Sequence, residues 1–230
     1  MNTRRHAAAH VFVDDLEQPR VDDTDRHHLL RVLRLRDGEI VTTSDGRGSW
    51  RECRFRAGDL DVVGPVFAEP TTARGAVVVF ALTKGDKPEV VVQKLTEIGV
   101  DRIVLFESSR SVVRWDADKA DRNLERLRRV AREAAMQSRR VTIPVVGPVM
   151  SSVEQVVAEF GDRVALAEPD CAPVDPRTEV IVVGPEGGFT DVELAACPRH
   201  VGLSATVLRA ETAAIVAGVT LVQFRDGAVR

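Results

Sequence analysis

The sequence predicts an α/β protein with two domains, a small β-rich one near residues 1–70 and a larger one near residues 75–230. Two changes of pattern lead to this division. Short strand-like runs separated by turn residues fill residues 10–69, whereas fully apolar runs alternate with helical segments from residue 76 onward. The chain has 230 residues, of which 44% are hydrophobic, so it can bury the core that both domains need.

The β-rich part has four strand-like runs, interrupted by D-G, G-R-G and G-D turns. These runs are "HVFV" (10–13), "EIVTTSD" (39–45), "WRECRFRA" (50–57) and "LDVVGPV" (60–66). One helical segment, residues 24–35, follows the first run, with Thr24 or Asp25 as its N-cap. This pattern is typical of a small β-barrel. The stretch "EPTTARG", residues 69–75, then has the composition of a linker.

In the larger part, apolar runs and helical segments follow one another along the chain. Strands are predicted at 76–82, 102–108, 163–169, 180–186 and 205–210, and helices at 87–100, 118–138, 190–197 and 211–224. Thr190 is the expected N-cap of the third helix. Because apolar strands that alternate with helices form parallel sheets covered on both faces, we expect such a sheet here.

The composition argues against several classes of protein. The formal net charge is −3, so a nucleic acid would have to meet a local basic patch. The three cysteines, Cys53, Cys171 and Cys197, form no C-x-x-C pair, so we expect no structural zinc site, no disulfide framework and a cytoplasmic location. The longest strongly apolar run, residues 76–82, is far too short to span a membrane, and we expect no membrane partner.

A glycine-rich loop follows the strand predicted at 180–186. Gly184, Gly187 and Gly188 allow a ligand to approach the backbone closely, but the loop is neither G-x-G-x-x-G nor a P-loop. Glu186 would repel a phosphate, whereas it suits a ligand with hydroxyl groups or a positive centre. The end of a parallel strand is where open α/β sheets bind ligands. The alternative is an ordinary turn between a strand and a helix.

Two further segments carry polar residues near strand ends. In "VLRAETAA" (207–214), Arg209 and Glu211 could face a site, or Glu211 and Thr212 could simply begin the last helix. In "LTKGDKPEVVVQKLTEIGV" (82–100), charged residues such as Lys84 crowd the end of the first strand. Gln93, Lys94 and Glu97 share one helical face, which more commonly faces solvent than a site.

Basic residues gather on two of the predicted helices. On helix 118–138 the apolar stripe is Leu124, Leu127, Ala131 and Ala134, and a separate face carries Arg122, Arg126, Arg129 and Arg132. In "HHLLRVLRLRDGE" (27–39), His28, Arg31 and Arg34 form a basic stripe, with Leu30 and Leu33 expected to point inward. Both surfaces could contact phosphates, and both could instead be solvated or packed helix faces.

Taken together, these segments resemble the RsmE-type family of ribosomal small-subunit RNA uridine-N3 methyltransferases, which belong to the SPOUT, or trefoil-knot, methyltransferases. The motifs that match in family order are "HHLLRVLRLRDGE", "KGDKPEVVVQKLTEIGV", "SRSVVRWD", "EAAMQSRRVTIP", "VGPEGGFTDVEL" and "VLRAETAA". The resemblance implies an N-terminal PUA-like β-barrel that holds RNA and a C-terminal α/β domain with a knot. It also implies a homodimer that binds S-adenosylmethionine in the knot and acts on 16S ribosomal RNA of the small subunit.

The same resemblance implies a set of site residues. The cofactor-binding residues would be Leu82, Leu166, Glu168, Gly184, Glu186, Gly187, Gly188, Leu203, Val207, Leu208, Arg209, Ala210 and Thr212. The basic residues themselves, rather than the resemblance, supply the candidates for RNA binding, which are His28, Arg31, Arg34, Lys84, Arg110, Arg126 and Arg129. No metal is implied. The chain departs from the family in two places. Ser204, Ala205 and Thr206 stand where many members have Gly-Pro-Arg, and the family's early R-x-F strand is His10-Val11-Phe12 here, with Arg4 and Arg5 upstream.

For methylation of uridine N3, the chain must favour loss of the N3 proton. Arg139, Arg140 and Arg209 are the candidates for stabilising the resulting anion, and Glu211 or Glu186 could act as a base. We place the arginines first. Two alternatives stay open, a related knot enzyme that methylates a ribose 2′-hydroxyl and an RNA-binding module without catalysis.

Overall fold

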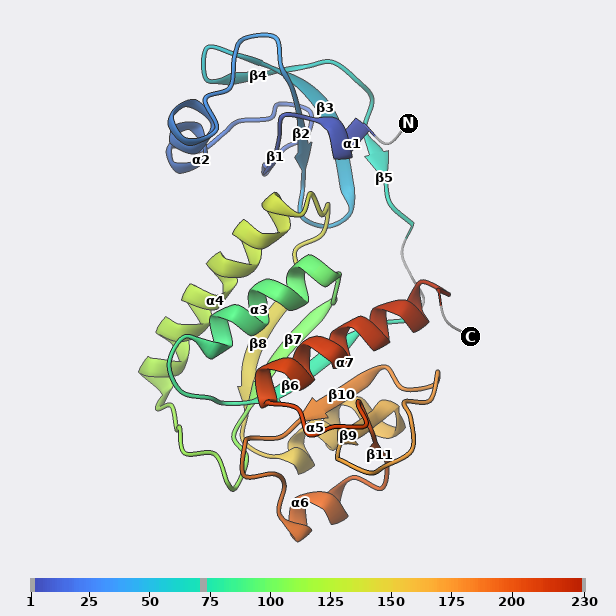
Figure 1. The fold of residues 1–230 in the computed structure, drawn as a ribbon. Helices are drawn as coiled ribbons and strands as arrows, with labels where there is room; N and C mark the ends of the chain where they lie inside the picture. The colour runs from blue at the N-terminus through green and yellow to red at the C-terminus, as the bar shows by residue number, and fades with distance from the viewer. Residues whose placement is uncertain (1–2, 71–73, 229–230) are drawn as a thin grey trace. The chain divides into compact units, whose positions relative to one another are not determined.

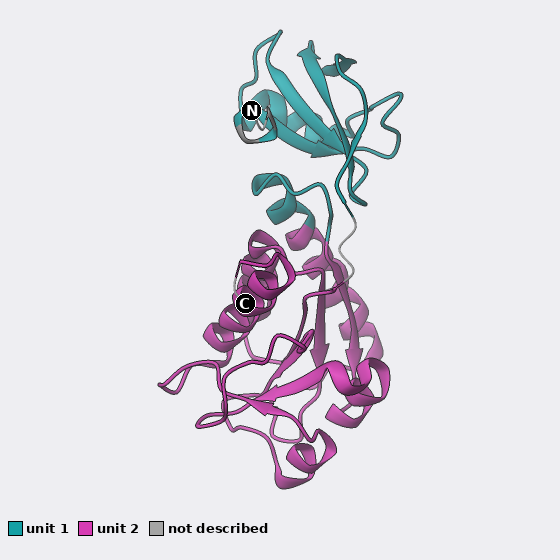
Figure 2. Ribbon diagram, turned by 90° about the vertical axis from the view of Figure 1, so that its right-hand side faces the viewer, with its two compact units in different colours: residues 1–71, 132–143 teal, residues 72–131, 144–230 magenta. Residues whose placement is uncertain are grey.

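The computed structural model describes residues 3–70 and 74–228, and the chain forms two compact units. Unit 1 contains residues 1–71 and 132–143, and unit 2 contains residues 72–131 and 144–230 (Figure 2). Packing therefore assigns residues 132–143 to the first unit, which the sequence did not indicate. The proposed boundary between an RNA-binding and a methyltransferase domain near residues 70–75 stays a prediction. Residues 71–73 of the expected linker lie outside the described residues.

Unit 1 is built on a five-stranded sheet that follows a short helix, α1 (Thr3–His6). The strands are β1 (Ala9–Phe12), β2 (Ile40–Ser44), β3 (Ser49–Arg56), β4 (Asp59–Val62) and β5 (Phe67–Ala68). They lie in the order β1-β2-β3-β4, with β5 paired to β3, and only β1 and β2 are parallel among these pairs. At the tight turn between β3 and β4, Ala57 and Gly58 both have positive φ, as in a type I′ hairpin turn.

The helical segment of unit 1 differs from its prediction. It comprises α2 (Asp23–His27), whose N-cap is Asp22 rather than Thr24 or Asp25, and a π-helical turn η1 (His28–Val32). Leu29 is fully buried, whereas Leu30 and Leu33 are 40% and 44% exposed. The expectation that Leu30 and Leu33 point inward was therefore wrong. The π turn explains the error, because its i→i+5 bonding shifts the angular spacing on which the expectation relied.

Residues 132–143 are held to unit 1 by polar and apolar contacts. Arg132 Nη2 lies 2.6 Å from Asp25 Oδ2, and Ser44 Oγ donates to the Val141 carbonyl at 2.7 Å. Met136 packs against the core of unit 1, which includes Val11 and Phe55. This packing explains why the end of one long helix belongs to a different unit from its beginning.

Unit 2 contains a six-stranded sheet in which every neighbouring pair is parallel (Figure 1). Its order is β11-β9-β10-β6-β7-β8. The strands are β6 (Val77–Ala81), β7 (Arg102–Phe106), β8 (Val145–Met150), β9 (Val164–Ala167), β10 (Val180–Val183) and β11 (His200–Val201). The predicted parallel sheet is thus confirmed.

Helices cover both faces of this sheet. One core joins alternate strand residues to α3 (Lys87–Ile98), α4 (Ala117–Gln137) and α7 (Ala210–Arg225). The other core joins the remaining strand residues to α5 (Val153–Phe160) and α6 (Asp191–Ala196), with a 3-10 turn η2 (Gly161–Arg163) after α5. The predicted apolar stripe of α4 is buried as expected.

The sequence located most elements of unit 2 but misplaced or missed three. Thr190 caps α6 in a capping box with Glu193, as predicted for the cap. β8 and α5 were not predicted. Residues 205–210 form no strand; they belong to a loop that ends in the first residue of α7, and the short strand β11 precedes it. Val207 in this loop is 84% exposed, which an apolar strand would not permit.

Candidate functional site

A cavity of about 340 Å³ lies in unit 2 at the carboxyl ends of two neighbouring strands. Three segments far apart in the sequence line it: the end of β9 (167–169), the end of β10 with the glycine loop (183–188), and the loop into α7 (203–213). β9 and β10 are parallel, so their carboxyl ends and the loops that follow them meet at one edge of the sheet.

The wall of the cavity combines apolar side chains, exposed backbone and a few charges. The apolar residues are Ala167, Pro169, Val183, Pro185, Leu203, Val207, Leu208, Ala210 and Ala213. Gly184 and Gly188 leave the backbone accessible, and Gly188 has φ +69°, which favours glycine. Glu168, Glu186 and Arg209 supply the charges. Such a wall suits a ligand with an apolar ring, hydrogen-bonding groups and a charged part.

Two chain segments that lead to the cavity pass very close to each other, one at Cys171 and Ala172 and the other at Gly202. Gly202 N donates to the Ala172 carbonyl at 2.7 Å, and a Cβ added at Gly202 would lie 2.5 Å from the Cys171 carbonyl oxygen. The obstacle is backbone, which cannot rotate away as a side chain could. Glycine at position 202 is therefore required for residues 168–169 and 203–204 to meet at the cavity.

The glycine loop is braced from outside the cavity by Glu193 and Arg110. The Glu193 carboxylate is buried and accepts hydrogen bonds from Ser108 Oγ at 2.8 Å, from Ser109 N at 2.9 Å and from the Thr190 N–H and hydroxyl. Burial alone would raise the pKa of Glu193, but these hydrogen bonds outweigh it and hold the pKa below its usual value. Arg110 Nη1 donates to the Gly187 carbonyl at 2.9 Å. The loop thus has a fixed course past the cavity.

A lysine connects two acidic residues beside the cavity. Lys87 Nζ lies 2.6 Å from Glu186 Oε1 and 3.4 Å from Glu211 Oε2. The hydrogen bond from Lys87 lowers the pKa of Glu186 and, reciprocally, raises the pKa of Lys87. On the opposite segment, burial raises the pKa of Glu168 against the opposing effect of His200 and Arg110.

Most residues expected to bind a cofactor line this cavity. They are Glu168, Gly184, Glu186, Gly188, Leu203, Val207, Leu208, Arg209 and Ala210. Four do not line it. Leu82 and Leu166 are core residues with 1% and 0% exposure, and Gly187 and Thr212 are neighbours of lining residues. The structure therefore places the segments near residues 168, 184 and 208 around one cavity. The side chain of Leu82 does not reach this cavity.

The residues expected to act in catalysis are found in both units. Arg209 is exposed, lines the cavity and is the N-cap residue of α7, and Glu211 lies in the first turn of that helix. Arg139 belongs to unit 1, where it has φ +58° and its guanidinium donates to the carbonyls of Arg4, at 2.6 Å, and Ala7. Arg140, also in unit 1, donates to Thr142 Oγ1 at 3.2 Å. Neither Arg139 nor Arg140 lines the cavity.

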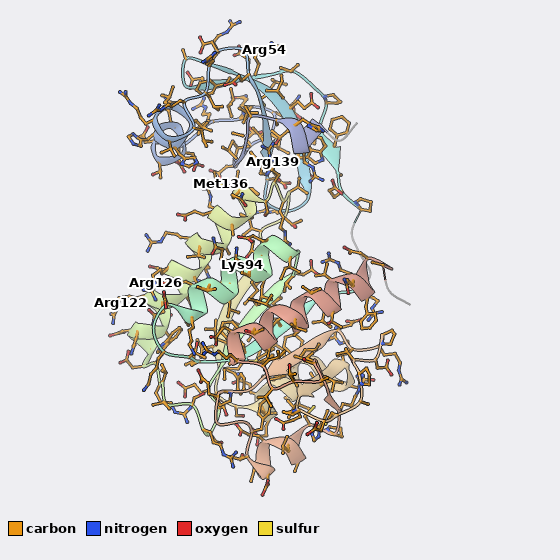
Figure 3. All side chains as sticks on the ribbon, in the orientation of Figure 1. Arg54, Lys94, Arg122, Arg126, Met136 and Arg139 are labelled. Carbon is orange, nitrogen blue, oxygen red and sulfur yellow. The ribbon has the colours of Figure 1, made fainter. Side chains whose placement is uncertain are left out.

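The residues expected to bind RNA are exposed, but some already have partners. His28, Arg31 and Arg34 of unit 1 and Lys84 and Arg129 of unit 2 are exposed. Arg126, which lies on α4 with Arg122 (Figure 3), forms a 2.6 Å ion pair with Glu89 of α3.

Several residues of the site were missed from the sequence. Thr190 and Glu193 carry the T-x-x-E spacing of a capping box, so Glu193 could have been found locally. Its bonds to Ser108 and Ser109, and the position of Lys87 between two carboxylates, depend on packing and leave no local signal. Among residues 3–70 and 74–228 no cluster of His, Cys, Asp and Glu could hold a metal ion. Within the same residues, no helix has the length and apolarity needed to cross a membrane.

Comparisons with known proteins agree with this architecture. A family model described as an RNA methyltransferase domain matches residues 71–222, and one described as an RNA methyltransferase PUA domain matches residues 21–60. These matches confirm the predicted fold class, an α/β methyltransferase domain on a parallel sheet preceded by a PUA-like domain.

Individual relatives match over most of their length. The chain is 35% identical over 217 residues to the ribosomal RNA small subunit methyltransferase E of Mycobacterium tuberculosis, covering 86% of this chain and 83% of that protein. It is 30% identical over 215 residues to the Bacillus subtilis protein of the same name, covering 83% and 84%. A crystal structure of the Neisseria gonorrhoeae protein of that name, bound to S-adenosyl methionine, has the same fold, with a TM-score of 0.76, 23% identity and 94% and 97% coverage. The chain therefore belongs to the ribosomal RNA small subunit methyltransferase E family.

Proposed function

We propose that this protein transfers a methyl group from S-adenosylmethionine to N3 of a specific uridine in 16S ribosomal RNA. The observation that carries the proposal is the convergence of residues 167–169, 183–188 and 203–213 on one cavity. This cavity lies within the residues matched by the RNA methyltransferase model. The family resemblance assigns one of these loops, the glycine loop at residues 184–188, to the knot that binds the cofactor.

The chemistry of the cavity fits this cofactor. Its volume of about 340 Å³ falls within the range of about 300–1,000 Å³ that is usual for small-molecule sites. The apolar wall and the accessible backbone of Gly184 and Gly188 suit an adenine ring and its hydrogen-bonding edge. Glu168 and Glu186 suit ribose hydroxyls or positive charge, and their carboxylates disfavour a phosphate-bearing nucleotide.

The bound cofactor would supply an electrophilic methyl group on a positively charged sulfur. The residues of the chain must orient the uridine and favour loss of its N3 proton. Arg209 is the leading candidate for stabilising the anion because it lines the cavity and its guanidinium has no hydrogen bond or ion pair to the described residues. Glu211 is engaged by Lys87 at 3.4 Å, so we place it second, as a base.

Arg139 and Arg140 remain candidates for the same stabilising task, with less support. The guanidinium of Arg139 already binds the carbonyls of Arg4 and Ala7, which gives it a structural task in unit 1. We further propose that the PUA-like domain, residues 1–70, and the basic residues His28, Arg31, Arg34, Lys84, Arg110, Arg126 and Arg129 contact the RNA. A homodimer acting in the cytoplasm completes the proposal.

Methyl transfer to RNA tests the proposal directly. Small ribosomal subunits lacking the modification are incubated with the protein and labelled S-adenosylmethionine, and the RNA is digested to nucleosides for mass spectrometry. The proposal expects label in N3-methyluridine. Label on a ribose 2′-hydroxyl would instead identify a related knot enzyme. No label despite measurable binding of RNA would identify a binding module.

A further inference from the structure

Lys87 forms ion pairs with both the glycine loop and helix α7, but it does not line the cavity itself. It is the first residue of α3, and its ammonium lies 2.6 Å from Glu186 in the glycine loop and 3.4 Å from Glu211 in the first turn of α7. Glu186 lines the cavity, but Lys87 does not. The lysine is therefore positioned to change the charge that a ligand experiences without competing for the ligand's space.

The three side chains carry two negative charges and one positive charge, so one carboxylate charge is left uncompensated within the group. Glu211 Oε2 is buried and makes no hydrogen bond to the part of the chain that the structure describes; the Lys87 ammonium at 3.4 Å is its ion-pair partner. Other cations near this group are Lys84, which acts on Glu186 electrostatically, Arg209, which lines the cavity, and Arg110, which binds the Gly187 carbonyl. Lys87 is the cation in direct contact with both carboxylates.

Methyl transfer changes the charge of the cofactor. The donor carries a sulfonium, and the product S-adenosylhomocysteine carries a neutral thioether in the same place, so the two ligands differ by one positive charge and one methyl group. We propose that Lys87 is a specificity-determining residue that screens Glu186 and Glu211 and thereby sets how strongly the cavity prefers the cationic donor over the neutral product. This inference rests on the proposed function, because it takes S-adenosylmethionine to be the ligand of the cavity.

The sign of the effect follows from electrostatics. Removing the ammonium leaves both carboxylates unscreened, which favours the donor, whereas removing a carboxylate disfavours it. Charges several ångströms apart near a protein surface interact strongly enough to change the ratio of the two affinities by about three- to tenfold. The change should shrink as salt is added, because exposed charges are screened.

Titration calorimetry with S-adenosylmethionine and with S-adenosylhomocysteine tests this inference. In Lys87→Met the ratio of donor affinity to product affinity should rise by about three- to tenfold, and in Glu186→Gln it should fall. Lys87→Arg, which keeps the charge, should retain the wild-type ratio. Lys94→Met is the matched control, because Lys94 lies on the same helix (Figure 3) and pairs with Glu97 rather than with a cavity residue.

If Lys87 had a purely structural role, Lys87→Met would weaken the binding of both ligands equally and leave the ratio of their affinities unchanged. That result would overturn the inference. An equal change of the ratio in Lys94→Met would overturn it as well, because the effect would then be a general one of net charge. If the wild-type protein binds neither ligand, the proposed function itself fails. The two failures are therefore distinguishable in one set of titrations.

Discussion

The Glu193 carboxylate accepts a 2.8 Å hydrogen bond from the Ser108 hydroxyl, a residue 85 positions earlier in the chain. Ser108 follows β7, and Glu193 lies in the first turn of α6, directly after the glycine loop. The same carboxylate accepts from Ser109 N and from Thr190. One buried acid thus connects the end of the loop that lines the cavity to the segment after β7, which is separated from β10 in the sheet by β6.

Replacing Glu193 should reveal this brace. Glu193→Gln turns part of the acceptor group into a donor, so at least one buried partner loses its bond, and the free energy of unfolding should fall by about 1–3 kcal/mol. Hydrogen bonds hold the folded-state pKa of Glu193 below the ordinary value of 4.5. The extra stability of the wild type over Glu193→Gln is therefore fully present above pH 4.5 and is lost as the pH falls through the folded-state pKa. Denaturant unfolding of both proteins between neutral and acidic pH measures it.

The exposed Glu125 provides the control for this prediction, because Glu125→Gln removes a charge without removing a buried acceptor. An unfolding difference between wild type and Glu193→Gln that is independent of pH would show that the ionised form has no special role.

Gly202→Ala should destabilise unit 2. The added Cβ would meet the Cys171 carbonyl oxygen at 2.5 Å, and relief requires a shift of backbone. We expect a loss of about 2–3 kcal/mol in the free energy of unfolding, measured by denaturant titration. Gly75→Ala is the control, since among the described residues other than its chain neighbours the nearest atom to its Cβ would be Val77 Cγ2, at 4.0 Å. Equal stability of the two variants would mean that the segments are less closely packed than described.

Arg132→Ala should destabilise unit 1, because it leaves the Asp25 carboxylate, whose side chain is 7% exposed, without its 2.6 Å partner. Breaking a buried ion pair lowers the free energy of unfolding by about 3–5 kcal/mol. Because Arg132 is partly exposed, we expect a smaller loss of about 2 kcal/mol here. Thermal unfolding measures the loss. Arg129→Ala, at an exposed position of the same helix, should change stability by less than about 0.5 kcal/mol. Similar losses in both variants would contradict a specific role for the pair.

Arg129 should instead contribute to RNA binding. If it contacts a phosphate, Arg129→Ala weakens RNA binding equally for all sequences and reduces the slope of log affinity against log salt by about one. Filter binding at several salt concentrations measures the slope. Arg177→Ala removes an 86% exposed arginine that pairs with Asp175 and should leave the slope unchanged. An unchanged slope in Arg129→Ala would remove this residue from the RNA surface.

The sequence was informative where local pattern decides structure. The fully apolar run at Val180–Val183 could only be a buried strand or helix, and its β-branched residues and the glycine that follows it favoured a strand. Thr190 could be predicted as a cap because capping depends on residues three positions apart. The inward side of Leu30 and Leu33 could not be predicted, because a π turn changes the spacing of side chains around the axis.

The site was only partly predictable for a related reason. That Glu168, Glu186 and Arg209 share a cavity depends on the neighbouring positions of β9 and β10 and on the close passage at Gly202. Strand order is a property of the whole sheet, and no local pattern records it. The resemblance to a known family implied that these three residues share a cofactor site, whereas the position of Lys87 between Glu186 and Glu211 came only from the structure.

Titration of S-adenosylmethionine into the wild-type protein and into Ala167→Phe tests the central claim most directly. Ala167 lies at the end of β9 and lines the cavity, so a phenyl ring there fills space that the ligand needs. The account predicts saturable binding to the wild-type chain and binding at least about tenfold weaker to the variant, with both proteins folded by circular dichroism. Equal affinity for the two proteins, or no binding to the wild-type chain, would contradict it.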